Sequence, residues 1–139
     1  MSGILDASFL VKLVLEERGS GKARGKFREL LVYGTPYTLD IALAEALNAI
    51  WKHAYLVKDL GVEAAWKAAS DLVELFLKLS VVPTATLYRE ALKAALATGL
   101  TVYDSLYIAA AKSLKKVLYT FDREIAKRAG RLVSIELLD

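Results

Sequence analysis

The stretch GILDASFLV, residues 3–11, sets the pattern that the rest of the chain repeats. Its first three residues are a short apolar run, which predicts a β-strand over Gly3–Leu5. Asp6 ends that strand, and apolar residues at helical spacing then predict a helix over Ala7–Glu17. A short strand that leads directly into a helix is the building unit of α/β folds, in which helices cover a mostly parallel sheet.

The alternation of short apolar runs and longer helical segments continues to the end of the chain. Further strands are predicted at Pro36–Leu39, Ser80–Val82, Val117–Phe121 and Leu132–Ile135. Helices are predicted at Asp40–Lys58, Val62–Leu77, Thr84–Ala97, Val102–Leu114 and Arg123–Ala129, and one more follows the glycine-rich basic segment Arg18–Lys26 and extends to about Val32. We therefore expect an α/β protein, a three-layer α/β/α sandwich with a central, mainly parallel sheet of four to five short strands. No linker or repeat interrupts residues 1–139, so we expect a single domain.

The composition excludes several classes of chemistry. The 139 residues include no cysteine, which rules out a disulfide framework, a thiolate zinc site, an iron–sulfur cluster and a cysteine nucleophile. His53 is the only histidine, so a histidine-based zinc site or a Ser-His-Asp relay would depend on that one residue. No signal peptide is recognisable, and the longest charge-free stretches are too short to cross a bilayer. We therefore expect a cytoplasmic protein.

Apolar residues make up 55% of the chain, whereas globular domains usually contain about 45–50%. We expect part of this surplus to lie on the surface, where it favours a partner protein or a second copy of the chain. The net charge of +3 is a weak indication of an anionic partner. Asn48 is the only asparagine and glutamine is absent, and this depletion of thermolabile residues indicates a thermophilic source.

Four acidic residues follow a predicted strand or lie in an early turn of the helix after it. They are Asp6, Glu45, Asp104 and Asp122. Ligands of parallel α/β sheets bind beyond the carboxyl ends of the strands, so these acids are expected to share one site. Each acid also has a purely structural interpretation, because Asp is a preferred N-cap and acids are stabilised near helix N-termini. Thr101 followed by Asp104 fits a capping box in the same way.

Asp104 and Glu45 favour a site over simple capping. In the helix predicted around Asp104, the exposed stripe is expected to pass through Ser105 and Lys112, so Asp104 falls on an apolar face with no basic residue one turn away. A carboxylate in such surroundings is costly without a counter-charge. Asn48 lies one turn from Glu45, and it is an amide retained in a chain nearly free of amides.

Carboxylates that converge repel one another unless they are protonated or bind a cation. A ligand set made only of oxygen atoms favours Mg²⁺ or Mn²⁺. Such ions deprotonate water and neutralise the charge that develops on a phosphodiester. The chain has no cysteine, and Ser8 has no base within its motif, so metal-bound water is the expected nucleophile.

Four segments around these acids resemble the motifs of PIN-domain nucleases, above all the VapC-type toxins of prokaryotic toxin–antitoxin pairs. The segments are ILDAS (4–8), LAEALNA (43–49), TVYDSLYIA (101–109) and LYTFD (118–122). The resemblance covers the chain from Gly3 to the last strand, and it implies a PIN-like fold, an RNA substrate, Mg²⁺ or Mn²⁺ as cofactor, homodimers and a small VapB-type antitoxin. It assigns catalysis and metal binding to the four acids, Asp6, Glu45, Asp104 and Asp122, and supporting roles to the hydroxyls of Ser8 and Thr120.

The segment Arg18–Lys26 is a candidate RNA-binding element because basic residues alternate in it with glycine. Its candidate phosphate contacts are Lys22, Arg24 and Lys26. An ordinary solvated loop and helix face would explain the same charges.

Other functions fit the sequence less well. A phosphatase with Asp6 as nucleophile would be expected to have a second acid at the position of Ser8, and a receiver-type signalling domain would need neighbouring acids at the first strand. A non-toxin PIN-domain nuclease that processes RNA and a non-enzymatic α/β interaction domain remain open alternatives. The leading interpretation is a metal-dependent endoribonuclease that acts as the toxin of a VapBC-type system.

Overall fold

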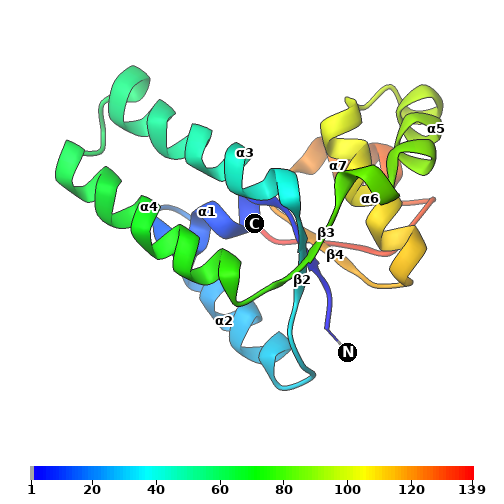
Figure 1. Ribbon diagram of the computed structural model, residues 1–139, viewed down its shortest axis with the longest axis horizontal. Helices are drawn as coiled ribbons and strands as arrows, with labels where there is room; N and C mark the ends of the chain where they lie inside the picture. Colours follow the sequence, from blue (N-terminus) through cyan, green and yellow to red (C-terminus); the bar gives the residue numbers. More distant parts are fainter. Residues whose placement is uncertain (1) are drawn as a thin grey trace.

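The computed structural model describes residues 2–139 and is built around one sheet of five strands (Figure 1). The strands are β1 (Ile4–Leu5), β2 (Tyr37–Leu39), β3 (Ser80–Val82), β4 (Leu118–Thr120) and β5 (Ile135–Leu137). They are arranged in the order β3-β2-β1-β4-β5, and every neighbouring pair is parallel. The expected parallel topology is therefore confirmed, and β1 lies at the centre of the sheet.

Helices connect the strands and cover both faces of the sheet. They are α1 (Ala7–Val14), α2 (Ser20–Leu31), α3 (Asp40–Trp51), α4 (Val62–Leu77), α5 (Tyr88–Thr98), α6 (Val102–Leu114) and α7 (Arg123–Ala129), together with a π-helix η1 (Lys52–Val57) and a 3₁₀ helix η2 (Thr84–Thr86). Helices α1 to α4 lie on one side of the strands, and α5, α6 and α7 lie on the other (Figure 1). This is the three-layer α/β/α sandwich expected when parallel strands are joined by right-handed crossovers.

The direction in which strands are added reverses at β1. From β1 the chain proceeds to β2 and β3 on one side, and later adds β4 and β5 on the other side. The register pairs Ile4 with Leu118 and Leu5 with Tyr119, so the residues that follow β1 and β4 leave the sheet side by side. In open parallel sheets, ligands bind outside the strand ends at such a reversal.

The core explains both the apolar strands and the burial of α6. Ile4, Leu5 and Leu118 are fully buried, because a central parallel strand is covered by helices on both faces. In α6 every residue from Ser105 to Ala111 is buried, because this helix packs against α5 and also contacts β1 and β4. The exposed stripe that we expected through Ser105 is therefore wrong.

The basic segment Arg18–Lys26 is mostly helical, whereas we expected it to lead into a helix. Helix α2 already begins at Ser20. The Ser20 hydroxyl donates a hydrogen bond to the Leu15 carbonyl over 2.8 Å and accepts one from the Glu17 N–H over 3.0 Å. These bonds hold the tight turn between α1 and α2, so the glycines of α2 occupy helical positions.

Other predicted boundaries shift as well: the helix predicted over Ala7–Glu17 ends at Val14, and the one predicted from Thr84 becomes α-helical only at Tyr88. The helix predicted over Asp40–Lys58 is α-helical only to Trp51 and then becomes a π-helix, which ends where Lys58 takes a left-handed conformation with φ 62°. The last strand is Ile135–Leu137 rather than Leu132–Ile135, because Leu132 still belongs to the turn after α7.

No single helix among residues 2–139 is both long and apolar enough to span a membrane. Helices α5 and α6 would be long and apolar enough only if they were taken together, and they are bent by 116° relative to one another. Most of α6 is buried inside the protein.

Candidate active site

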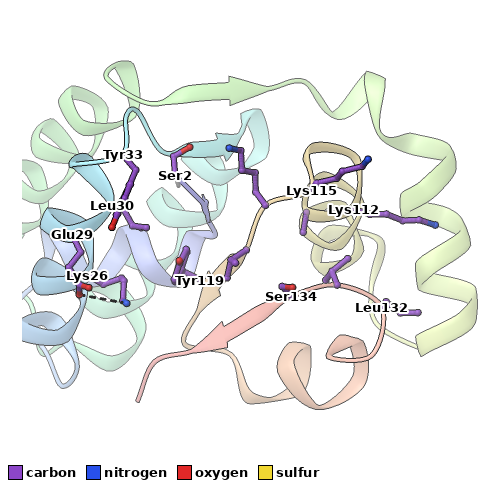
Figure 2. A pocket seen from close by; sticks show the side chains of 14 residues that line it. Ser2, Lys26, Glu29, Leu30, Tyr33, Lys112, Lys115, Tyr119, Leu132 and Ser134 are labelled. Atoms are coloured by element: carbon purple, nitrogen blue, oxygen red, sulfur yellow. Dashed lines mark ion pairs between the residues drawn. The ribbon is translucent and has the colours of Figure 1, made fainter.

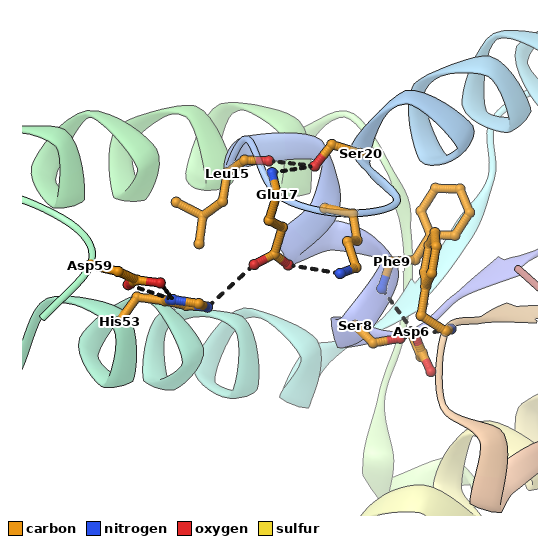
Figure 3. A network of polar contacts seen from close by, with 10 residues as sticks. Asp6, Ser8, Phe9, Leu15, Glu17, Ser20, His53 and Asp59 are labelled. Atoms are coloured by element: carbon orange, nitrogen blue, oxygen red, sulfur yellow. Dashed lines mark hydrogen bonds and ion pairs between the residues drawn. The ribbon is translucent and has the colours of Figure 1, made fainter. Parts of the chain in front are cut away.

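Asp6 lies at the centre of the carboxyl edge of the sheet. It directly follows β1 and is only 2% exposed. Its Oδ1 accepts hydrogen bonds from the Ser8 hydroxyl over 2.6 Å and from the Phe9 N–H over 3.0 Å, and Figure 3 shows both residues beside it. Its Oδ2 accepts a hydrogen bond from the Thr120 hydroxyl at the end of β4. Asp6 is therefore both the N-cap of α1 and a buried carboxylate with both oxygens bonded.

The hydroxyls of Ser8 and Thr120 are held so that their protons point at Asp6. Ser8 Oγ accepts a hydrogen bond from the Phe121 N–H over 3.1 Å, and Thr120 Oγ1 accepts one from the Asp122 N–H over 2.9 Å. Each hydroxyl has a single proton, and it donates that proton to Asp6. The two hydroxyls thus lie beside Asp6.

Burial makes the negative charge of Asp6 costly. Burial raises the pKa of Asp6 to about 6, although the hydrogen bonds from Ser8, Thr120 and Phe9 lower it; the charge of Asp122 raises it further. A carboxylate that is destabilised in this way is stabilised by a nearby cation.

Glu45 on α3 faces α6. Its Oε1 accepts a hydrogen bond from the Tyr107 hydroxyl over 2.7 Å, and Tyr107 is itself 2% exposed. Burial raises the pKa of Glu45, the bond from Tyr107 lowers it, and the charges of Asp104 and Asp6 raise it. Asn48, one turn further along α3, is exposed to solvent.

Asp104 lies in the first turn of α6, and Asp122 directly precedes α7. Burial raises the pKa of Asp104, and the charge of Asp122 raises it further. The side chain of Asp104 is not the cap of α6, because Thr101 fills that role and accepts a hydrogen bond from the Asp104 N–H over 3.2 Å. Asp122 is a cap: its Oδ1 accepts hydrogen bonds from the N–H groups of Glu124 and Ile125.

The four acids affect one another's ionisation. The pKa of Asp6 responds to Asp122, that of Glu45 to Asp104 and Asp6, and that of Asp104 to Asp122. Charge effects of this kind require that the carboxylates lie near one another. These charge effects link the four acids in pairs, and we call Asp6, Glu45, Asp104 and Asp122 the acid cluster.

The acid cluster presents only oxygen ligands. Among residues 2–139, no three His, Cys, Asp or Glu side chains converge closely enough to hold a metal ion. The chemistry of the cluster nevertheless fits a hard divalent cation, because its members repel one another and three of them, Asp6, Glu45 and Asp104, have raised pKa values.

Lys26, one of the candidate RNA contacts, lies away from the acid cluster. It pairs with Glu136 over 3.1 Å. It also lines a cavity of about 610 Å³ whose other lining residues include Ser2 and Ser134, which precede β1 and β5 (Figure 2). This cavity is at the amino ends of the strands, opposite the acids.

The other two candidate RNA contacts differ in their partners. Arg24 pairs with Glu16 over 2.9 Å, so much of its charge is compensated. Lys22 is exposed and has no ion-pair partner within the described part of the chain. Of the three residues, Lys22 alone presents an uncompensated charge to solvent.

His53 lies between two carboxylates that the sequence does not single out. Its Nε2 is 3.3 Å from Glu17 and its Nδ1 is 2.8 Å from Asp59 (Figure 3). Glu17 also pairs with Lys12 over 3.1 Å. Sequence spacing gives no signal for this network, because Glu17 lies in the turn after α1 and His53 lies in η1, 36 residues later, and the two meet only in the folded chain.

Comparisons with known proteins agree on one family. The family model for the PIN domain matches residues 3–131. "Ribonuclease VapC3" of Pyrobaculum aerophilum is 33% identical over 136 residues, which cover 96% of this chain and 99% of that protein. "Exonuclease VapC9" of the same organism is 34% identical over 100 residues, which cover 72% of this chain and 71% of that protein.

Solved structures have the same fold. The PAE2754 protein from Pyrobaculum aerophilum superimposes with a TM-score of 0.66 at 31% identity, covering 92% of this chain and 86% of that chain. A toxin–antitoxin complex from Klebsiella pneumoniae gives a TM-score of 0.67 at 12% identity, covering 97% and 96% of the two chains, and this likeness concerns the fold alone. Because the family model spans most of the sequence and VapC3 is similar over nearly its whole length, the chain belongs to the PIN-domain family.

Proposed function

We propose that this protein is a Mg²⁺- or Mn²⁺-dependent endoribonuclease and the toxin of a VapBC-type toxin–antitoxin pair. The observation that carries the proposal is the acid cluster beyond the carboxyl ends of the strands, whose members raise one another's pKa values in pairs, while burial raises the pKa of Asp6 to about 6. The name of the relative VapC3, a ribonuclease, supports RNA as the substrate.

The residues of the site divide into ligands and supporting groups. The acid cluster would hold the cation, through Asp6, Glu45, Asp104 and Asp122. The Ser8 and Thr120 hydroxyls keep Asp6 in one orientation through the bonds they donate to its two oxygens. A divalent cation bound there supplies a more acidic water molecule and neutralises charge on the phosphodiester.

An antitoxin and a second copy of the chain are the proposed protein partners. The name of the Klebsiella pneumoniae structure, a toxin–antitoxin complex of the same fold, supports an antitoxin. The surface also supports association, because large apolar side chains are exposed on several helices. Those exposed by more than half include Tyr55, Leu56, Trp66, Leu77, Leu92 and Leu96.

Cleavage of a defined circular RNA tests the activity and the mode of cutting together. Only an endonuclease can open a circle, whereas the relative VapC9 is named as an exonuclease. We expect the purified protein to linearise the circle with Mg²⁺ or Mn²⁺ and not with EDTA. Cleavage that persists in EDTA would reject the metal-dependent mechanism, and degradation of linear RNA alone would reject the endonuclease.

A further inference from the structure

A groove leads away from the acid cluster along α1 and the end of α3. It has a volume of about 440 Å³, and its lining includes Ser8, Lys12, Glu17, Lys52 and His53. Ser8 is the residue whose hydroxyl donates to Asp6. The groove therefore begins at the proposed catalytic site and continues toward η1.

The two lysines of the groove differ in their surroundings. Lys12 pairs with Glu17 over 3.1 Å, and its Nζ lies 5.3 Å from the centre of the Phe121 ring, so its position is fixed. Lys52, at the start of η1, is exposed and has no ion-pair partner among residues 2–139. Lys52 therefore presents a free positive charge at the wall of the groove.

We propose that this groove binds the RNA strand next to the scissile phosphate, with Lys52 and Lys12 in contact with phosphate groups. The inference rests on the proposed function and adds the path of the substrate. A cluster of carboxylates repels a polyanion, so cations close to the cluster are needed to hold one. Grooves that bind single-stranded nucleic acid commonly place such cations along the path of its phosphate backbone. Lys26 cannot serve in this way, because it lies at the amino ends of the strands.

Glu17 is expected to act in the opposite direction and to weaken RNA binding in the groove. Its Oε1 pairs with Lys12 over 3.1 Å, and its Oε2 lies 3.3 Å from Nε2 of His53, so in the free protein this carboxylate lies against two basic side chains of the groove. Figure 3 shows Glu17 directed toward His53, with Asp59 on the far side of the ring. A phosphate in the groove would compete with Glu17 for the Lys12 ammonium, and Glu17 therefore lowers the affinity for RNA.

The first experiment measures binding of a fluorescent single-stranded RNA to the full chain in EDTA, by anisotropy over a salt series. Lys52→Ala should raise Kd by about 3- to 10-fold and lower the salt slope by about one. Lys93→Ala is the matched control, because Lys93 is an exposed lysine on α5, on the other side of the sheet. Its Kd should change less than about 2-fold. Equal effects of the two substitutions would overturn the proposal.

The second experiment tests a substitution that should tighten RNA binding instead of weakening it. Glu17→Gln removes the competing charge at nearly constant shape, so its Kd for the same RNA should fall by about 2- to 5-fold. Glu90→Gln on α5, whose partner is Lys112, controls for the loss of one acid elsewhere and should leave Kd unchanged. A Kd that rises in Glu17→Gln, or stays equal to that of Glu90→Gln, would contradict the groove. Circular-RNA cleavage by the unmodified protein is scored separately. Cleavage without these binding effects rejects only the groove, and absence of cleavage rejects the proposed function.

Discussion

The hydroxyl of Tyr107 on α6 donates a hydrogen bond to Oε1 of Glu45 on α3 over 2.7 Å, and this bond joins the two helix layers at the acid cluster. The bond stabilises the ionised form of Glu45, since it lowers the pKa that burial and the charges of Asp104 and Asp6 raise. Tyr107 is only 2% exposed. We therefore regard it as a positioning residue for Glu45.

Tyr107→Phe should slow RNA cleavage while it leaves the ring packing intact. Loss of a partner to a proposed ligand typically costs about 10-fold in activity or metal affinity. Without the bond the pKa of Glu45 rises, so the acid side of the pH–rate profile should move to higher pH. Tyr119→Phe, at a buried tyrosine away from the acids, is the control. A slower enzyme with an unmoved pH profile would show that Tyr107 matters only for packing.

The raised pKa of Asp6 should make the metal-free protein less stable as the pH rises. Its pKa is about 6 in the folded protein, whereas the ordinary value for an aspartate is 3.8, so the folded state binds this proton more tightly than the unfolded chain does. The resulting stability is complete below the unfolded pKa and is lost as the pH rises through the folded one. A pKa difference of this size corresponds to about 3 kcal/mol in the free energy of unfolding.

Urea unfolding of the unmodified protein and of Asp6→Asn in EDTA measures this effect. The difference between their free energies of unfolding isolates Asp6 from other groups that titrate. Between about pH 4 and pH 7.5 we expect the unmodified protein to lose about 2.5 kcal/mol of its free energy of unfolding relative to Asp6→Asn. A difference that is constant with pH would mean that Asp6 has an ordinary pKa.

Asp104→Asn tests whether Asp104 serves metal-dependent cleavage or only the stability of the fold. Asp104 is not the cap of α6, and burial and the charge of Asp122 raise its pKa. Removal of this charge should therefore abolish metal-dependent cleavage and leave the metal-free Tm unchanged or higher. Mg²⁺ or Mn²⁺ should raise the Tm of the unmodified protein by mass action, and that of the variant much less. A variant that melts lower without metal and still cleaves RNA would make Asp104 structural.

The sequence predicts the sheet well because short apolar runs are local patterns, and the four acids were selected from their places relative to those runs. Asp6 follows an apolar run, and a parallel sheet brings the ends of such runs to one edge. The pair Tyr107 and Glu45 depends instead on how α6 packs against α3, and no spacing encodes a contact between residues so far apart. The same holds for His53 with Glu17. The exposed stripe predicted through Ser105 was wrong for a related reason. Every residue of α6 from Ser105 to Ala111 is buried, so the helix has no solvent-exposed stripe along that stretch.

Ser105 also yields a stability prediction. Within the described residues, its Oγ is a buried side-chain atom without a hydrogen-bond partner. An unsatisfied buried hydroxyl loses its bonds to water and gains nothing in return. Ser105→Ala should therefore keep the free energy of unfolding unchanged or raise it by up to about 1 kcal/mol.

Ser20→Ala is the matched control for Ser105→Ala, because Ser20 is equally buried but fully bonded. Its hydroxyl donates to Leu15 and accepts from Glu17, so the same substitution should cost about 1–2 kcal/mol. Urea unfolding of the two variants at one pH makes the comparison. If Ser105→Ala lost as much stability as Ser20→Ala, the Ser105 hydroxyl would have a partner in the folded protein, and a polar contact as well as packing would hold α6 in place.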